Sequence, residues 1–197
     1  FIITIPIVIV IVAFPDAIIR ILFGNDFLPA SQALQILALS SLFYPIFSLV
    51  STSIVAIGKP MTNTKIIAAM TMLNLAMNIV LVPSIGIIGA ALATTLSYFF
   101  GTLLMVFYFR KDVRFHLYPM DMMKAFFGGV FTFAVVVFTK NLLQYTNIWI
   151  EIFVAVSAGV LFYIAFIILT YTVKRNEIEK IREAGVPIPK VVMKIVR

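Results

Sequence analysis

Two apolar helices joined by a very short turn constrain this chain more than any other stretch of its sequence. The stretch runs from Asn74 to Thr95 and contains Pro83 and Gly86 near its middle. A Pro/Gly connection of this length leaves room only for a tight reversal between two antiparallel helices. Asn74 and Asn78 are four residues apart in the incoming helix, so we expect both amides on one face.

The outgoing helix carries a small residue at every fourth position, namely Gly89, Ala93, Ser97 and Gly101. A row of this kind lets the backbone of a neighbouring helix approach closely. It therefore predicts a packing face. A packing face on one helix and an amide pair on the other predict a helix bundle around a polar interior.

These helices are expected to lie in a lipid bilayer. Of the 197 residues, 62% are hydrophobic and 12% are charged, whereas soluble domains have about 45–50% apolar and about 25% charged residues. A soluble protein of this size could not bury so much apolar surface. The chain has no cysteine and one histidine, His116, which argues against a disulfide framework and against thiolate or histidine-cluster metal sites.

Six apolar segments approach the roughly 20 residues that cross a hydrocarbon core of about 30 Å. The predicted spans are residues 1–23, 33–57, 63–82, 86–109, 122–139 and 148–173. Pro15 is predicted to kink or break the first span, and Pro45 lies inside the second. Residues 174–197 are predicted to form a cytoplasmic, basic amphipathic tail on the inner membrane face. Because the chain opens inside an apolar run, we expect it to be a fragment.

The distribution of cations predicts that both ends of the chain are cytoplasmic. If the ends of spans two, four and six share a side, 13 of the 15 Lys and Arg residues lie on it, and only Arg20 and Lys140 lie on the other. Cytoplasmic loops of membrane proteins carry such an excess. The net charge of +7 then reflects these loops and anionic lipid headgroups, and nucleic acid is not an expected partner.

Asp16 and Arg20 are spaced by four, so they can pair on one face if the helix continues past Pro15. One interpretation makes them a charged feature at the outer end of a substrate cavity, because intramembrane charge is costly and usually functional. In the other, which we favour, Pro15 has already brought the chain to the outer headgroups, where both side chains are solvated.

A polar stripe along the third predicted span consists of Thr71, Asn74 and Asn78. It can line a watery path, or it can form hydrogen bonds to neighbouring helices worth roughly 0.6–2 kcal/mol each. The sequence favours neither interpretation.

Hydroxyl groups crowd one broad side of the second predicted span around Pro45, among them Tyr44 and Ser48. They can satisfy backbone groups that the proline leaves free, which is the favoured interpretation, or they can offer hydrogen bonds to a sugar. Tyr98 on the fourth span is a weaker candidate for the same path.

The chain lacks the patterns of an intramembrane enzyme. No predicted span carries two acidic residues, and there is no His-x-x-x-His or Glu-x-x-His pattern and no glycine-rich phosphate loop. We expect no catalytic residue and no metal site.

Several segments resemble one known family in order and spacing. They are Pro15–Gly24 with Phe27 and Ala30, Leu34–Leu39, Ala56–Pro60, Asn74–Pro83 and Gly86–Thr94. Together they resemble the polysaccharide flippases of the multidrug/oligosaccharidyl-lipid/polysaccharide exporter superfamily. The resemblance covers roughly residues 15–110, and the last two spans match only in hydropathy.

This resemblance implies an all-α membrane protein: a six-helix bundle that is one lobe, the C-terminal one, of a two-lobe carrier in the cytoplasmic membrane of a prokaryote. The carrier would flip a lipid-linked saccharide by alternating access, with membrane lipids and a missing N-terminal lobe, on the same or a second chain, as its partners. The family commonly lines its path with cations, and here only Arg20 is suitably placed. A Na⁺ or H⁺ coupling site would need a buried acid, for which Asp16 is the candidate, and coupling stays open.

Two other functions remain open. One is a cation-coupled multidrug or metabolite antiporter of the same superfamily, which keeps the fold and changes the cargo. The other is a non-transporting membrane scaffold whose small-residue faces bind partner helices.

Overall fold

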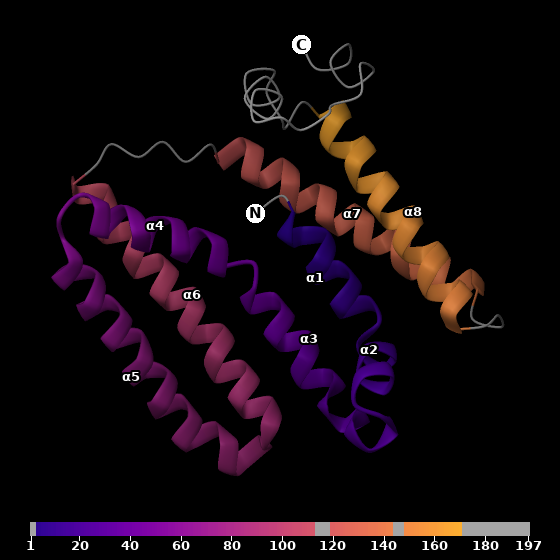
Figure 1. The fold of residues 1–197 in the computed structure, drawn as a ribbon, viewed down its shortest axis with the longest axis horizontal. Coiled ribbons are helices and arrows are strands. Elements are labelled where there is room, and N and C mark those ends of the chain that lie inside the picture. The colour runs from indigo at the N-terminus through magenta and orange to yellow at the C-terminus, as the bar shows by residue number, and fades with distance from the viewer. Residues whose placement is uncertain (1–2, 113–118, 144–147, 171–197) are drawn as a thin grey trace. The chain divides into compact units, whose positions relative to one another are not determined.

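The computed structural model describes residues 3–112, 119–143 and 148–170, and these ranges are helical throughout, with turns between the helices and no strand (Figure 1). The predicted all-α fold is thereby confirmed. The chain divides into two compact units. Among the described residues, one consists mainly of residues 10–112, and the other of residues 4–9, 119–143 and 148–170.

The first predicted span is broken where the sequence predicts it. Helix α1 (Thr4–Ala13) and helix α2 (Pro15–Leu22) meet at an angle of 83°. Phe14 between them leaves the helical conformation, and Pro15 begins α2 at a position where its missing N–H costs nothing. After α2, Gly24 adopts a positive φ of 92° and leads into the 3₁₀ helix η1 (Asn25–Ala30).

The sequence predicts one continuous span over residues 33–57, but the structure has two helices there. Helix α3 (Ser31–Ser40) and helix α4 (Tyr44–Ala56) are separate, and the chain bends by 42° between them. Residues 41–43 close three tighter i→i+3 turns, with N···O distances of 3.0–3.1 Å. The physical reason is Pro45, which has no N–H to continue the α-helical ladder and therefore stands in the first turn of α4.

The tight reversal predicted after Pro83 is present. Helix α5 (Pro60–Ile85) and helix α6 (Ile87–Asp112) are joined by Gly86 alone, at a positive φ of 60°. Helix α5 runs three residues beyond the predicted end at Val82, through Pro83. Pro83 removes its own backbone hydrogen bond, but the last turn still closes through Gly86 N donating to the Val82 carbonyl at 2.8 Å.

The small-residue row of α6 is a packing face, as predicted, and the helix that packs on it is α5. All four residues of the row are buried, and a Cβ added at Gly89 or Gly101 would collide with Leu81 or Met70 of α5. The two helices therefore approach as closely as a missing side chain allows.

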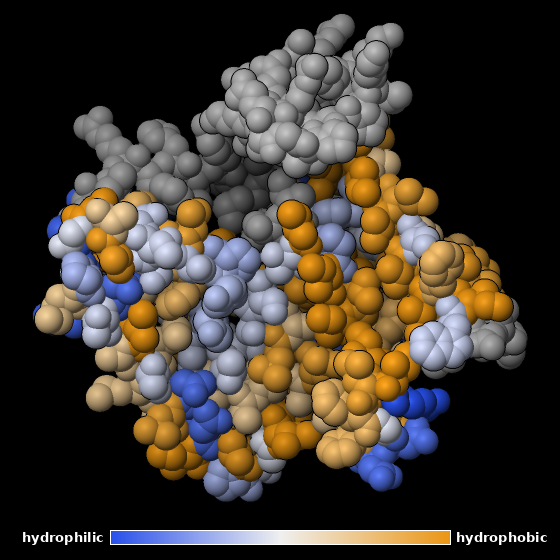
Figure 2. All heavy atoms as spheres, viewed as in Figure 1, coloured by the Kyte–Doolittle hydropathy of each residue, from blue (hydrophilic) through white to orange (hydrophobic). Residues whose placement is uncertain are grey.

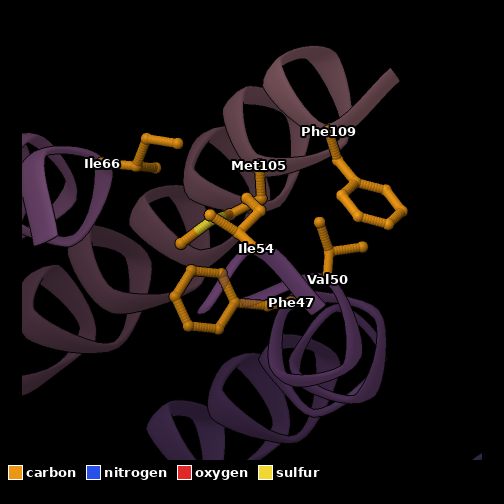
Figure 3. Close-up of a cluster of buried hydrophobic side chains, with 6 residues drawn as sticks. All are labelled: Phe47, Val50, Ile54, Ile66, Met105 and Phe109. Atoms are coloured by element: carbon orange, nitrogen blue, oxygen red, sulfur yellow. The ribbon is translucent and has the colours of Figure 1, made fainter. Parts of the chain in front are cut away.

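A hydrophobic cluster holds α4, α5 and α6 together (Figure 3). Its buried members are Phe47, Val50 and Ile54 of α4, Ile66 of α5, and Met105 and Phe109 of α6. The α4 residues are three and four positions apart, so one face of this short helix supplies all three. The cluster fixes α4, and with it the hydroxyl groups around Pro45, onto α6.

The second unit is built on helix α7 (Pro119–Leu143) and helix α8 (Ile148–Leu169). Their contact is made by small or buried residues, since a Cβ at Gly159 of α8 would collide with Val136 of α7. A Cβ added at Gly129 of α7 would likewise collide with Ile5, which lies in the first part of α1. The predicted tail at 174–197 lies outside the described residues.

Among the residues that the structure describes, four helices, α5 to α8, are long and apolar enough to cross a membrane. The bent pairs α1–α2 and η1/α3–α4 bring the number to six if each pair is one span. Large apolar side chains cover much of the visible surface (Figure 2). On α5 the only buried residue is Ile66, while Met72 is 72% exposed. Such a surface suits lipid as its solvent.

Candidate functional site

The two asparagines of α5 form a hydrogen-bonded pair that faces α6. Asn78 donates through Nδ2 to the backbone carbonyl of Asn74 at 2.9 Å and to its Oδ1 at 3.0 Å. Asn74 donates in turn to Oγ1 of Thr94 in α6 at 3.5 Å. Both asparagines are half-buried. The two amides thus share one face of α5, as their spacing predicts, and that face is hydrogen-bonded to α6.

Thr71 does not join this pair. Its side chain is exposed, and its hydroxyl donates to the backbone carbonyl of Ile67 within α5 at 2.9 Å. A hydroxyl already satisfied by its own helix offers a neighbour only its remaining acceptor capacity.

Two tyrosines from the predicted path meet between α4 and α6. The rings of Tyr44 and Tyr98 lie edge to face with their centroids 6.1 Å apart, and Phe47 packs against Tyr98 at 5.9 Å. Tyr44 is 54% exposed. Ser48 is half-buried one turn beyond Tyr44, and its carbonyl accepts a hydrogen bond from Thr52 at 2.9 Å. This group combines aromatic surface with hydroxyls.

Asp16 and Arg20 do not form the ion pair that a continuous helix would allow. Both are exposed on α2, and neither takes part in a salt bridge or a side-chain hydrogen bond with the described residues. Helix α2 does continue past Pro15 as far as Leu22, so both residues share one helix beyond the 83° bend, and their spacing of four alone does not bring them together.

Further polar contacts between helices or at their breaks were not expected from the sequence. Gln35 Nε2 donates to the Val12 carbonyl at 3.0 Å. Thr95 Oγ1 lies 3.0 Å from the Ile36 carbonyl and 2.9 Å from the Ala91 carbonyl of its own helix, so its one proton is shared between them. Thr102 Oγ1 donates to the Tyr98 carbonyl at 2.7 Å and lies 3.5 Å from the Phe43 carbonyl. Val12 lies three residues before Pro15, and breaks at proline are where helical carbonyls lose partners. The position of Pro15 could thus have pointed to the Gln35 contact. The Phe43 carbonyl already accepts from Phe47 N at 3.0 Å, and nothing in the local sequence marks Thr95.

These features define a multi-pass α-helical membrane protein whose helices are joined by amides and hydroxyls as well as by apolar packing. The family described as "Lipid II flippase MurJ" matches residues 1–169. The chain belongs to the MurJ family, within the superfamily that its sequence motifs resemble.

Two curated relatives match most of this chain. An uncharacterized membrane protein of Methanocaldococcus jannaschii is 30% identical over 182 residues, which cover 92% of this chain and 35% of that protein. The probable low-salt glycan biosynthesis flippase Agl15 of Haloferax volcanii is 28% identical over 166 residues, which cover 84% of this chain and 35% of that protein. The chain thus spans about a third of the length of these relatives.

A solved structure has the same fold. It is a lipid II flippase MurJ in an inward closed conformation, with a TM-score of 0.69 and 24% sequence identity, and the match covers 85% of this chain and 36% of that one.

Proposed function

We propose that this chain is the C-terminal lobe of a two-lobe carrier that flips a lipid-linked saccharide across the cytoplasmic membrane of a prokaryote. The observation that carries the proposal is the family match over residues 1–169. The name of the Haloferax volcanii relative, a probable flippase of glycan biosynthesis, supports a saccharide precursor as the cargo. The chain acts by moving its substrate and not by transforming it.

The physical requirement is a path for a polar headgroup through a layer that excludes it. The isoprenoid tail of such a substrate can stay in lipid, while the saccharide needs hydrogen-bonding groups along its way. The partly exposed pair Tyr44 and Tyr98 and the half-buried Ser48 are the groups that α4 and α6 contribute to this path. Arg20 is the cation that meets the substrate phosphate, since it is exposed and has no partner among the described residues.

We place both ends of the chain on the cytoplasmic side, on the basis of the cation count. A second lobe, in the same chain or another, completes the path. If export is coupled to Na⁺ or H⁺, Asp16 is the acidic group that we propose for the site. Because Asp16 is exposed, groups from the other lobe would have to enclose it.

The test is a flipping assay with the full-length protein that carries this chain. The protein is reconstituted in vesicles, and a fluorescent lipid-linked oligosaccharide is followed as it becomes accessible to a membrane-impermeant quencher. Movement of this lipid supports the proposal. Movement of a cationic dye but not of the lipid would assign a multidrug antiporter, and movement of neither would assign a non-transporting scaffold.

Two variants test the residues of the path. We expect Arg20→Ala to lower the flipping rate about tenfold, because the loss of one charge-assisted hydrogen bond to the substrate costs about 1.5 kcal/mol. We expect Asn78→Ala to lower the flipping rate as well, with unchanged expression. Lys65→Ala, which removes an exposed cation of α5, serves as the control and should flip normally.

The two readouts for Asn78 separate its two roles. If Asn78→Ala lowers only the thermal stability and leaves the rate per folded protein unchanged, its pair with Asn74 serves helix packing. If both Arg20→Ala and Asn78→Ala transport at the wild-type rate, the path lies elsewhere.

A further inference from the structure

Two shallow grooves follow α6, and both end at Arg110. They share Leu103, Val106 and Arg110, which form a ridge between them. One groove, of about 480 Å³, is completed by residues of α6 itself, with Phe107 among them. The other, of about 360 Å³, is completed by α6 together with Phe43 and Ile46 at the start of α4.

The lining of both grooves is apolar and accessible. Leu103 on the ridge is 52% exposed, and Phe107 in the larger groove is 57% exposed. Thr102, the polar side chain of the smaller groove, is buried, and its hydroxyl is hydrogen-bonded to the Tyr98 carbonyl at 2.7 Å. Along their length the grooves therefore offer apolar surface, and a hydrocarbon chain is the ligand that such a surface suits.

The end of the grooves is cationic. Arg110 is exposed and forms no hydrogen bond or ion pair with the described residues. The Nζ of Lys111 lies 4.5 Å from the centroid of the Phe107 ring and 5.1 Å from that of Tyr108, within the range of a cation–π contact. A second cation is thus held beside the larger groove, and an anionic group at this end meets both charges.

The length of the grooves matches one leaflet of a bilayer. From Phe99 to Arg110 the helix advances eleven residues, or roughly 16 Å at about 1.5 Å per residue. Half of a hydrocarbon core of about 30 Å is about 15 Å. A lipid chain that starts at Arg110 would therefore end near the bilayer midplane.

We propose that this surface of α6 binds one anionic phospholipid of the surrounding bilayer. Its phosphate lies at Arg110, with Lys111 beside it, and its two chains lie in the two grooves on either side of the Leu103–Val106 ridge. Two grooves with a common cationic end fit a lipid with two chains and one phosphate, whereas a single-chain isoprenoid lipid would occupy only one of them. The inference is independent of flipping, because it concerns a lipid of the membrane and not the cargo.

The test measures lipid retention by native mass spectrometry. The full-length protein is delipidated and equilibrated with mixed micelles that hold equal amounts of a phosphatidylglycerol and a phosphatidylcholine. We expect the wild type to retain one phosphatidylglycerol in preference. Arg110→Gln should lower this preference about fivefold, because one cation near an anionic headgroup contributes about 1 kcal/mol. Arg110→Lys keeps the charge and should keep most of the preference. Lys65→Gln removes an exposed cation elsewhere and should leave the preference unchanged.

A second pair of variants tests the grooves themselves. Leu103→Trp extends the ridge into both grooves and should lower retention of phosphatidylglycerol and phosphatidylcholine alike. Leu75→Trp changes a leucine of α5 that is 60% exposed and lies outside the grooves, and it should have no effect. Unfolding temperatures in detergent identify any variant that has lost its fold.

Three results would overturn the proposal. If the wild type retained the two phospholipids equally, the site would not select an anionic headgroup. Equal losses of preference in Arg110→Gln and Lys65→Gln would show diffuse attraction instead of a site. Displacement of the bound lipid by a single-chain lipid-linked oligosaccharide at equimolar concentration would assign the grooves to the cargo.

Discussion

At the scale of single residues, Gly89 and Gly101 belong to one sequence pattern but lie against different groups of α5, a backbone and a side chain. Both belong to the small-residue row of α6, and both are buried. A Cβ at Gly89 would lie 2.5 Å from the backbone oxygen of Leu81, which cannot move without shifting α5. A Cβ at Gly101 would meet the side chain of Met70, which can adopt another rotamer.

We therefore predict that Gly89→Ala destabilises the protein by about 1–3 kcal/mol, as overpacking does. Gly101→Ala should be close to neutral, because alanine favours the helix by about 1 kcal/mol over glycine and this offsets the displacement of Met70. Unfolding in dodecyl sulfate mixed micelles measures both. Equal destabilisation by the two variants would contradict the assignment of a rigid and a yielding contact.

At the scale of elements, the short helix α4 depends on packing for its stability. The break after α3 leaves it as a separate short helix instead of one end of a longer one. A helix of 13 residues is marginal by itself, and its buried face is the row Phe47, Val50 and Ile54 against α5 and α6 (Figure 3). The bend before α4 follows from Pro45, but the direction in which α4 then runs follows from this cluster.

We predict that Ile54→Ala destabilises the protein by about 2–5 kcal/mol, since Ile54 is 2% exposed and its truncation leaves a cavity among α4, α5 and α6. Leu75→Ala, at a side chain of α5 that is 60% exposed, removes a similar volume and should cost less than about 1 kcal/mol. The same micelle titration compares the two. A cost of Ile54→Ala no larger than that of Leu75→Ala would mean that the cluster does not stabilise α4.

At the scale of the whole molecule, the membrane orientation is a prediction from charge alone. The count places Lys59 on the cytoplasmic side and the end of α7, with Lys140, on the outer side. The side chains of Lys59 and of Asn141 are exposed, so both positions are open to a reagent.

We expect Lys59→Cys, in a cysteine-free background, to react with a membrane-impermeant maleimide only in inside-out vesicles. Asn141→Cys should react only in right-side-out vesicles. Labelling is read as a mass shift after quenching. The reverse pattern would invert the orientation, and with it the leaflet that faces Arg110.

The sequence by itself determined the membrane-spanning class, the approximate positions of the helices, the reversal at Gly86 and the packing face of α6. These follow from local chemistry: the length of an apolar run, the missing N–H of a proline, the freedom of glycine at positive φ, and a spacing of four. The family resemblance rested on the same turns and helix ends, and it is confirmed by the match over residues 1–169.

Only the tertiary structure decided which partner each polar side chain meets. Spacing put Asn74 and Asn78 on one face, but the contact with Thr94 arises because α6 folds back along that face. Spacing also allowed Asp16 and Arg20 to pair, and they do not, although they share α2. The grooves at Arg110 likewise depend on where α4 lies beside α6. The physical reason is that such contacts join segments distant in the chain, and their geometry is set by packing that no single helix encodes.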